Sequence, residues 1–203
     1  METRKKLELH LQGLQVLTQD EINIILDATV LKECKKGDFL LLEGQTQTQC
    51  YTILEGCIRE YSLAEGEEKT TAFYTEGDKI TSYTAAGKKT ASKHYLECSE
   101  DVVLTVSTQN FEDDLRKLVP RLDAIIQQIA MEQLSKGKDE WTNFVSSSPE
   151  ERYTKLMETR PYLFNRVPQH QIASYLGIKP ESLSRIRKRI HTKHQSNSDS
   201  ANS

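Results

Sequence analysis

Five glycines spaced 7 to 12 residues apart constrain the fold of this 203-residue chain more than any other feature. The segments around them are short and rich in β-branched and aromatic residues, as in "CYTILEGCIREY" and "EDVVLTVS". A glycine at the end of a strand can take the positive φ that a tight turn needs. The pattern therefore predicts a small antiparallel sandwich or barrel over residues 31–108. The five are Gly37, Gly44, Gly56, Gly66 and Gly77.

Helical periodicity precedes this segment. Residues 4–13 and 19–30 are predicted to form short helices, the second of them capped by Thr18. No glycine cluster joins a strand to a helix in the region that follows, so a phosphate-binding loop is the poorer interpretation of the glycines.

A long helix is predicted after Pro120. About 25 helical residues would extend about 37 Å, which is longer than one face of a small sandwich needs. The surplus apolar stripe favours a dimer seam, while a purely core-facing stripe stays open as the alternative. The stripe comprises Leu122, Ile125, Ile126, Ile129, Ala130 and Leu134, then Trp141, Phe144 and Val145 beyond Gly137.

A new unit is predicted to begin at Ser148, which can cap a helix that has Pro149 in its first turn and acidic residues after it. We therefore expect three parts. They are a sensor domain over 1–118, a dimerisation helix over 119–147, and a C-terminal domain over 148–203 that ends in a polar tail.

Within this last part, the stretch "QIASYLGIKPESLSRIRKRI" at 171–190 carries two apolar helical patterns separated by Gly177. The small Ala173 allows two helices to approach closely, Gly177 can turn the chain, and Pro180 can begin the second helix. Leu183, Ile186 and Ile190 then form its inner stripe. The stretch predicts a helix-turn-helix, whereas a solvated cationic face alone would need neither the glycine nor a second amphipathic helix.

Side-chain chemistry assigns roles on the outer face of the second helix. Arg185 can donate two hydrogen bonds to guanine, Glu181 can accept one from a cytosine amino group, and Ser182 can bond a base edge or a phosphate. Flanking polar residues are predicted phosphate contacts, although a surface histidine at a helix start is an equally good interpretation of one of them, His170. These flanking residues are Gln169, His170, Lys179, Lys188 and Arg189.

The charge distribution agrees with a polyanion partner for this end of the chain. The formal net charge is −3, but residues from 150 onward carry ten Lys and Arg against five Asp and Glu, which leaves −8 on the preceding residues. An acidic body with a basic end is typical of nucleic-acid contact by the basic part.

With these motifs the chain resembles the Crp/Fnr family of bacterial transcription regulators, chiefly in "QIASYLGIKPESLSRIRKRI" and in "KKGDFLLLEGQ … YTILEGCIREY". The resemblance implies an α+β fold with an N-terminal cyclic-nucleotide-binding-type β-roll, a long dimerisation helix and a C-terminal helix-turn-helix, winged-helix-like domain. It also implies a Glu, a Ser and an Arg that read DNA, here Glu181, Ser182 and Arg185. The implied partners are double-stranded DNA with a palindromic operator, a second copy of the chain, RNA polymerase, and a small-molecule effector.

The chain departs from the cyclic-AMP-binding members of this family after Gly77-Asp78. It has no Gly-Glu-Leu segment, and Thr90-Ala91-Ser92 stands where those members carry an Arg-Ser/Thr-Ala triplet. Lys88 and Lys89 could supply charge but not the bidentate fork of arginine. We therefore expect an unknown effector other than cyclic AMP, and too few residues precede the first motif helix for a full wing hairpin.

The cysteines predict no cofactor and no metal. Cys34, Cys50, Cys57 and Cys98 are separated by 16, 7 and 41 residues, which matches no paired-ligand spacing and no clustered iron–sulfur set. Buried thiols are the expected state.

Other function classes fit less well. The N-terminal "METRKKLELHLQG" lacks the continuous apolar core of an export signal, and no apolar run reaches membrane length, so we expect a cytoplasmic protein without membrane contact. No catalytic grouping of Ser, His, Asp or Cys stands out, which argues against an enzyme. The main alternative is a ligand-sensing β-roll whose basic domain contacts protein or RNA.

Overall fold

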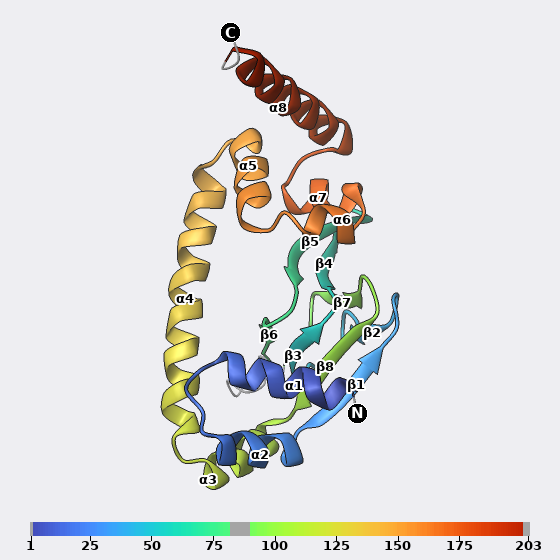
Figure 1. Cartoon of the computed structure of the whole chain (residues 1–203). Coiled ribbons are helices and arrows are strands. Elements are labelled where there is room, and N and C mark those ends of the chain that lie inside the picture. The colour runs from blue at the N-terminus through green and yellow to red at the C-terminus, as the bar shows by residue number, and fades with distance from the viewer. Residues whose placement is uncertain (1, 82–89, 201–203) are drawn as a thin grey trace.

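The computed structural model describes residues 2–81 and 90–200, and its sheets lie between two groups of helices (Figure 1). The N-terminal helices are α1 (Glu2–Gly13) and α2 (Gln19–Ala28). The strands follow as β1 (Val30–Cys34), β2 (Phe39–Leu41), β3 (Cys50–Glu55), β4 (Ile58–Ala64), β5 (Glu67–Tyr74), β6 (Lys79–Ile80), β7 (Tyr95–Cys98) and β8 (Val102–Ser107). The remaining helices are α3 (Gln109–Leu118), α4 (Leu122–Ser146), α5 (Pro149–Thr159), α6 (Leu163–Arg166), α7 (Gln169–Tyr175) and α8 (Pro180–Ser200).

The strands form two four-stranded sheets with the orders β1-β8-β3-β6 and β2-β7-β4-β5, and every pairing is antiparallel. Their inner faces enclose an apolar core that includes Ile53, Ile58, Leu96, Val102 and Leu104. All five glycines of the predicted pattern have a positive φ, between 80° and 100°. The antiparallel architecture predicted from their spacing is confirmed.

Gly56 shows why one of these positions accepts no other residue. Its φ is +100°, and a Cβ atom there would lie 2.9 Å from the Cα atom of Val102. The β3–β4 turn thus passes directly against the start of β8, and only a residue without a side chain fits.

The N-terminal helices close one end of the roll together with α3. Thr18 and Glu21 form a capping box at the start of α2. Leu7, Leu11 and Ile25 are buried in a cluster that α3 and the start of α4 complete. We did not assign α3 from the sequence, although Thr108 caps it by accepting a hydrogen bond from the Phe111 N–H.

Helix α4 has 25 residues, as predicted, and its apolar residues differ in burial between the two halves of the helix. In its first half Leu122 is buried, and Ile125, Ile126 and Ile129 are half-buried next to the roll. In its second half Leu134, Trp141 and Val145 are 65–71% exposed, as is Met131 before them. The second half of the stripe thus lies beyond the part of α4 that packs on the roll, which contradicts the purely core-facing alternative, and the dimer seam stays a prediction.

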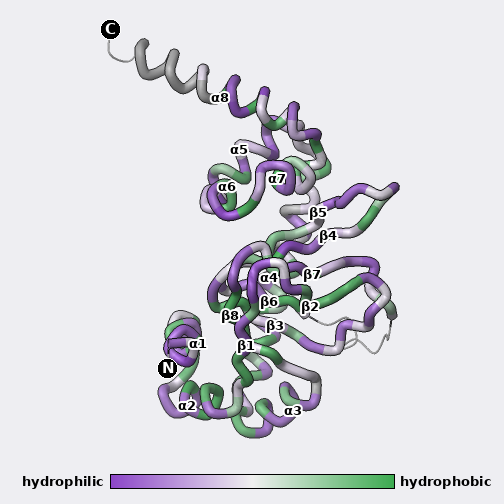
Figure 2. The backbone as a smooth tube through the Cα atoms, turned by 90° about the vertical axis from the view of Figure 1, so that its right-hand side faces the viewer, coloured by the Kyte–Doolittle hydropathy of each residue, from purple (hydrophilic) through white to green (hydrophobic). Residues whose placement is uncertain are grey.

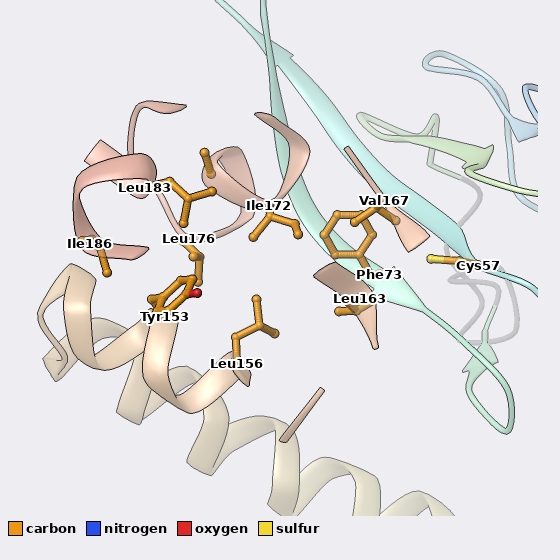
Figure 3. Packing of buried hydrophobic residues seen from close by; sticks show 11 residues of the cluster. Cys57, Phe73, Tyr153, Leu156, Leu163, Val167, Ile172, Leu176, Leu183 and Ile186 are labelled. Carbon is orange, nitrogen blue, oxygen red and sulfur yellow. The ribbon is translucent and has the colours of Figure 1, made fainter. Parts of the chain in front are cut away.

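The C-terminal helices pack around a third apolar cluster, which Figure 3 shows from close by. It joins Tyr153 and Leu156 of α5 to Leu163 of α6 and to residues of α7 and α8. Cys57 and Phe73 of the roll belong to the same cluster, so this domain rests on the roll. In Figure 2, α5 to α8 lie at the opposite end of the molecule from α1 to α3.

Two expectations about this domain have different outcomes. Residues 148–200 contain no strand, so the wing hairpin is missing, as the short spacing predicted. The polar tail after 190, however, continues α8 as helix as far as Ser200.

All four cysteines are free and buried, which confirms the structural interpretation of these thiols.

Candidate nucleic-acid interface

The turn between α7 and α8 has the geometry that the sequence predicted. Gly177 adopts φ +68° directly after the C-cap residue Leu176. The N–H of Gly177 donates to the Ser174 carbonyl and the N–H of Ile178 to the Ala173 carbonyl, each at 3.0 Å. These bonds satisfy the last carbonyls of α7 and direct the chain into α8, which begins at Pro180.

The inner faces of the two helices meet without a gap for solvent. Ile172 and Ala173 of α7 are 0% exposed, and Leu183 of α8 is 1% exposed (Figure 3). Ala173 permits this close approach, as expected for its size. Ile186 is buried and Ile190 packs against the cluster, so one face of α8 is fixed to the domain and the opposite face is outward.

The outward face of α8 carries the residues predicted to read DNA. Glu181 and Arg185 are exposed and lie one helical turn apart, while Ser182 is half-buried beside them. Lys188 is exposed three residues beyond Arg185. Within the described residues, neither Arg185 nor Lys188 takes part in an ion pair.

The predicted phosphate contacts differ in their surroundings. Lys179 is exposed in the turn, and Gln169 and His170 are exposed at the start of α7. Arg189 instead forms an ion pair with Glu150 of α5, with Nη1 and Oε2 2.9 Å apart. Arg189 thus also connects α8 to α5, a role that the sequence did not indicate.

The helix-turn-helix is fixed to the roll by one hydroxyl group. Ser174 Oγ of α7 donates to the Glu68 carbonyl and accepts from the Thr70 N–H, both at 2.9 Å. The two partners belong to β5, more than 100 residues earlier in the chain. Sequence analysis missed Ser174, because a serine in a helix carries no signal of such a contact.

Arg166 forms a second connection between the two domains. Its Nη1 and Nη2 donate to the two carboxylate oxygens of Glu76 at 2.9 and 2.8 Å, and its Nε donates to Glu100 at 2.9 Å. Partial burial acts to raise the pKa of the Glu76 carboxyl, but the hydrogen bonds from Arg166 and from the Gly56 N–H outweigh it and lower this pKa. The carboxylate is therefore held in its charged form by the connection.

Arg160 adds a third connection. Its Nη2 donates to the Phe73 carbonyl at 2.9 Å and to Thr75 Oγ1 at 3.2 Å, and its Nε donates to the Tyr162 hydroxyl. Asp78 lies 3.6 Å from the same guanidinium.

The interior of the roll shows no arrangement for a cyclic phosphate in its described part. The buried Arg59, 2% exposed, alternates along β4 with the core residue Ile58, so it lies on the other face of the sheet, where it pairs with Glu68 at 2.7 Å. Ser92 is held by backbone hydrogen bonds with Gly44 and Gln45. Lys88 and Lys89, which the sequence raised as sources of charge, lie outside the described residues.

The sequence was compared with family models and with known proteins. No family model matches it. It is 21% identical over 179 residues to the anaerobic regulatory protein of Aggregatibacter actinomycetemcomitans, covering 82% of this chain and 68% of that protein. It is 22% identical over 166 residues to the transcriptional activator protein Anr of Pseudomonas protegens, covering 75% and 66%. The chain thus spans about two thirds of the length of these relatives.

These similarities agree with the resemblance to the Crp/Fnr family of transcription regulators.

Solved structures confirm the α+β fold of the chain. FixK2 from Bradyrhizobium japonicum matches with a TM-score of 0.65 at 18% identity, covering 82% of this chain and 86% of that one. The c-di-GMP-responsive regulator CLP of Xanthomonas campestris matches with a TM-score of 0.67 at 12% identity, covering 87% and 93%. The catabolite activator protein of Thermus thermophilus matches with a TM-score of 0.54 at 15% identity, covering 89% and 87%.

Both of the relatives found by sequence are named as regulatory proteins rather than as enzymes. In the part of the chain that the structure describes, no helix combines the length and apolarity needed to cross a membrane.

Proposed function

We propose that this Crp/Fnr regulator acts as a homodimer that reads a palindromic DNA site with α8, under the control of an effector other than cyclic AMP. The observation that carries the proposal is the outward face of α8, where Glu181 and Arg185 are exposed while Leu183 and Ile186 fix the opposite face. A helix held in this way can enter the major groove with its orientation already set.

On this face Arg185 donates a bidentate pair to guanine O6 and N7, Glu181 accepts from a cytosine amino group, and Ser182 bonds a base edge or a phosphate. The surrounding residues hold phosphates and set the register of the protein on the duplex. These are Gln169, His170, Lys179, Lys188 and Arg189, the last through the guanidinium that also pairs with Glu150.

The second half of α4 supplies the dimer seam in this proposal. Met131, Leu134, Trp141 and Val145 follow one another at intervals of 3, 7 and 4 residues, which matches the a and d positions of a heptad. Their exposed fractions of 65–71% are large for apolar side chains on one helix. Pairing two such helices in parallel would place two copies of α8 about one duplex turn apart.

The effector would act by favouring one geometry of the paired α4 helices. The described core of the roll is apolar and does not indicate which effector binds. The effector and the operator sequence are to be identified by experiment. We further propose that the regulator works in the bacterial cytoplasm and contacts RNA polymerase there, on the basis of its family.

The main test is selection of duplexes from a random pool, with and without a small-molecule extract of cells. We expect a palindromic consensus and a change in its recovery when the extract contains the effector. A pool without any consensus, together with retained small-molecule binding, would favour the alternative of a ligand-sensing roll with protein or RNA contacts.

Arg185→Ala then tests the reading residue. It should weaken operator binding by about 1–3 kcal/mol and relax the preference at one base position. Arg187→Ala is the matched control, because Arg187 is exposed on the same helix but two residues away, on another face. An equal loss of affinity for all sequences would instead make Arg185 a phosphate contact.

A further inference from the structure

A cavity of about 140 Å³ lies where the C-terminal end of α4 meets α5 and α7. Three of its lining residues are cationic, namely Arg152, Lys155 and Arg160, and none is acidic. This excess of positive charge distinguishes the cavity from the rest of the domain junction, where arginines have carboxylate partners. Arg166 pairs with Glu76 and Arg189 with Glu150, and of the three cations at the cavity Arg160 has a carboxylate near it, that of Asp78 at 3.6 Å.

Arg152 has no such partner among the residues that the structure describes. Its guanidinium lies over the ring of Phe144, 4.6 Å from the centroid. Its Nε atom is buried and donates no hydrogen bond. A buried donor without an acceptor is costly, because the group has lost its water without gaining a replacement.

Lys155, one turn further along α5, also forms no ion pair within the described residues. Two hydroxyls at the cavity have already used their protons, since Ser147 donates to the Asn143 carbonyl and Thr159 to the Lys155 carbonyl. The guanidinium of Arg152 and the ammonium of Lys155 are the charged donors at the cavity that have no carboxylate partner among the described residues. Both donors require an acceptor, and both favour one that is negatively charged.

The remaining walls are apolar. Phe144, Leu156 and Leu176 line the cavity beside the two cations. A volume of about 140 Å³ is well above the roughly 10–15 Å³ that a single water molecule requires. The cavity thus suits a small organic molecule with one charged end and one flat or apolar side.

We propose that this junction cavity, defined by Phe144, Arg152, Lys155, Leu156 and Leu176, binds a small oxyanion, a carboxylate or a phosphate group on a compact apolar body. Arg152 provides the fork that grips two oxygens, and Lys155 provides a second positive charge.

The position of this junction cavity gives such a ligand access to the reading helix. A Cβ atom placed on Gly177 would lie 3.8 Å from Arg152 Nη1 and 4.0 Å from Phe144 Cζ, so the cavity adjoins the turn that sets the direction of α8. Its walls also come from α4, whose exposed seam is proposed to join two copies. A ligand there stabilises one arrangement of α4 relative to α7. This coupling rests on the proposed function, whereas the binding itself does not.

The test uses the full-length protein without DNA. Sodium benzoate and inorganic phosphate are titrated separately at constant ionic strength, with sodium chloride as the balancing salt. Heat of binding and the emission of Trp141, the one tryptophan in the chain, are the readouts. Trp141 lies one turn before Phe144 on α4, so binding in the cavity should alter its emission.

We expect saturable binding of at least one of the two anions, with one site per chain. Arg152→Gln should weaken it at least tenfold, and Lys155→Gln several-fold. Lys155 is exposed, so its replacement tests the proposal even if the Arg152 variant folds poorly. Arg187→Gln, which removes a positive charge elsewhere in the domain, should leave the affinity unchanged.

Two results would overturn the proposal. One is the absence of saturable binding by either anion at millimolar concentration beyond the effect of chloride. The other is an equal affinity in the wild type, Lys155→Gln and Arg152→Gln. If the cations instead serve DNA phosphates, neither free anion will saturate, and both variants will lower the salt dependence of DNA binding by about one ion. A protein that binds the anion but selects no DNA would contradict the proposed function and leave this site standing.

Discussion

The connection between Arg166 and Glu76 offers a quantitative test of how firmly the helix-turn-helix domain is fixed to the roll. Two parallel hydrogen bonds of 2.9 and 2.8 Å join the guanidinium to the carboxylate. The side chain of Arg166 is 22% exposed and that of Glu76 is 44% exposed. Exposed ion pairs contribute up to about 1 kcal/mol, and hydrogen bonds to charged groups about 1.5–3 kcal/mol when shielded from water. Discounting for this exposure, we expect a coupling energy of about 1–2 kcal/mol.

A double-mutant cycle measures this coupling. Arg166→Gln, Glu76→Gln and the double variant are compared by urea unfolding at one fixed protein concentration, since the proposed dimerisation would make stability depend on concentration. Glutamine at position 76 keeps an oxygen that can accept from the Gly56 N–H, which Glu76 now does at 2.8 Å. A coupling energy below about 0.3 kcal/mol would refute the assignment of this pair as a connection that holds the domain.

The same pair predicts a pH dependence. The pKa of Glu76 is lowered in the folded protein, so the stabilisation is present above the unfolded value of about 4.3 and is lost as the pH falls through the folded value. The difference in unfolding free energy between the wild type and Glu76→Gln should therefore be largest near pH 7 and shrink below pH 4. A difference that stayed constant across this range would contradict the charge-based explanation.

Three further substitutions test other features. Gly56→Ala should destabilise the roll by more than about 2 kcal/mol in urea unfolding, because the positive φ and the contact with β8 both oppose a side chain. Gly66→Ala, where the added Cβ atom would meet nothing, should cost only about 1–2 kcal/mol. Equal costs of the two substitutions would exclude the contact with β8 as the reason. Leu134→Glu should raise the dimer dissociation constant at least tenfold in sedimentation equilibrium, while Leu63→Glu should not, since Leu63 is an exposed leucine of the roll, 48% exposed against 71% for Leu134. A monomeric wild type would contradict the proposed seam. Ser174→Ala should cost about 1–2 kcal/mol, since it leaves two backbone groups of β5 without their partner, and an unchanged unfolding midpoint would show that water replaces the hydroxyl there.

The sequence predicted those features that depend on local spacing. The positive φ of Gly177, the burial of Ala173 and the start of α8 at Pro180 all follow from residues within one or two turns of each other. The strands and their turns were predictable for the same reason, because glycine at a turn acts on its own backbone.

Features that depend on distant partners were not predictable. The apolar residues of α4 read as one stripe, yet Ile126 faces the roll and Leu134 faces outward, because the roll reaches only the first half of the helix. Ser174 and Arg189 gave no signal of their contacts with β5 and with Glu150. Neither helical periodicity nor charge counting can indicate which surface polar residue finds a partner over 30 residues away.

The burial of Cys57 has a consequence for measuring domain motion. Its side chain is 0% exposed in the cluster that also holds Leu163 and Val167 of the C-terminal domain (Figure 3). Burial raises the pKa of this thiol to about 12, so almost no thiolate exists at neutral pH while the two domains are in contact. Alkylation of Cys57 can therefore proceed only as fast as the C-terminal domain lifts from the roll, whereas Cys34 and Cys98 report the opening of the roll itself. Comparing these labelling rates would time the release of the reading helix in the unmodified chain, without an added fluorophore or spin label.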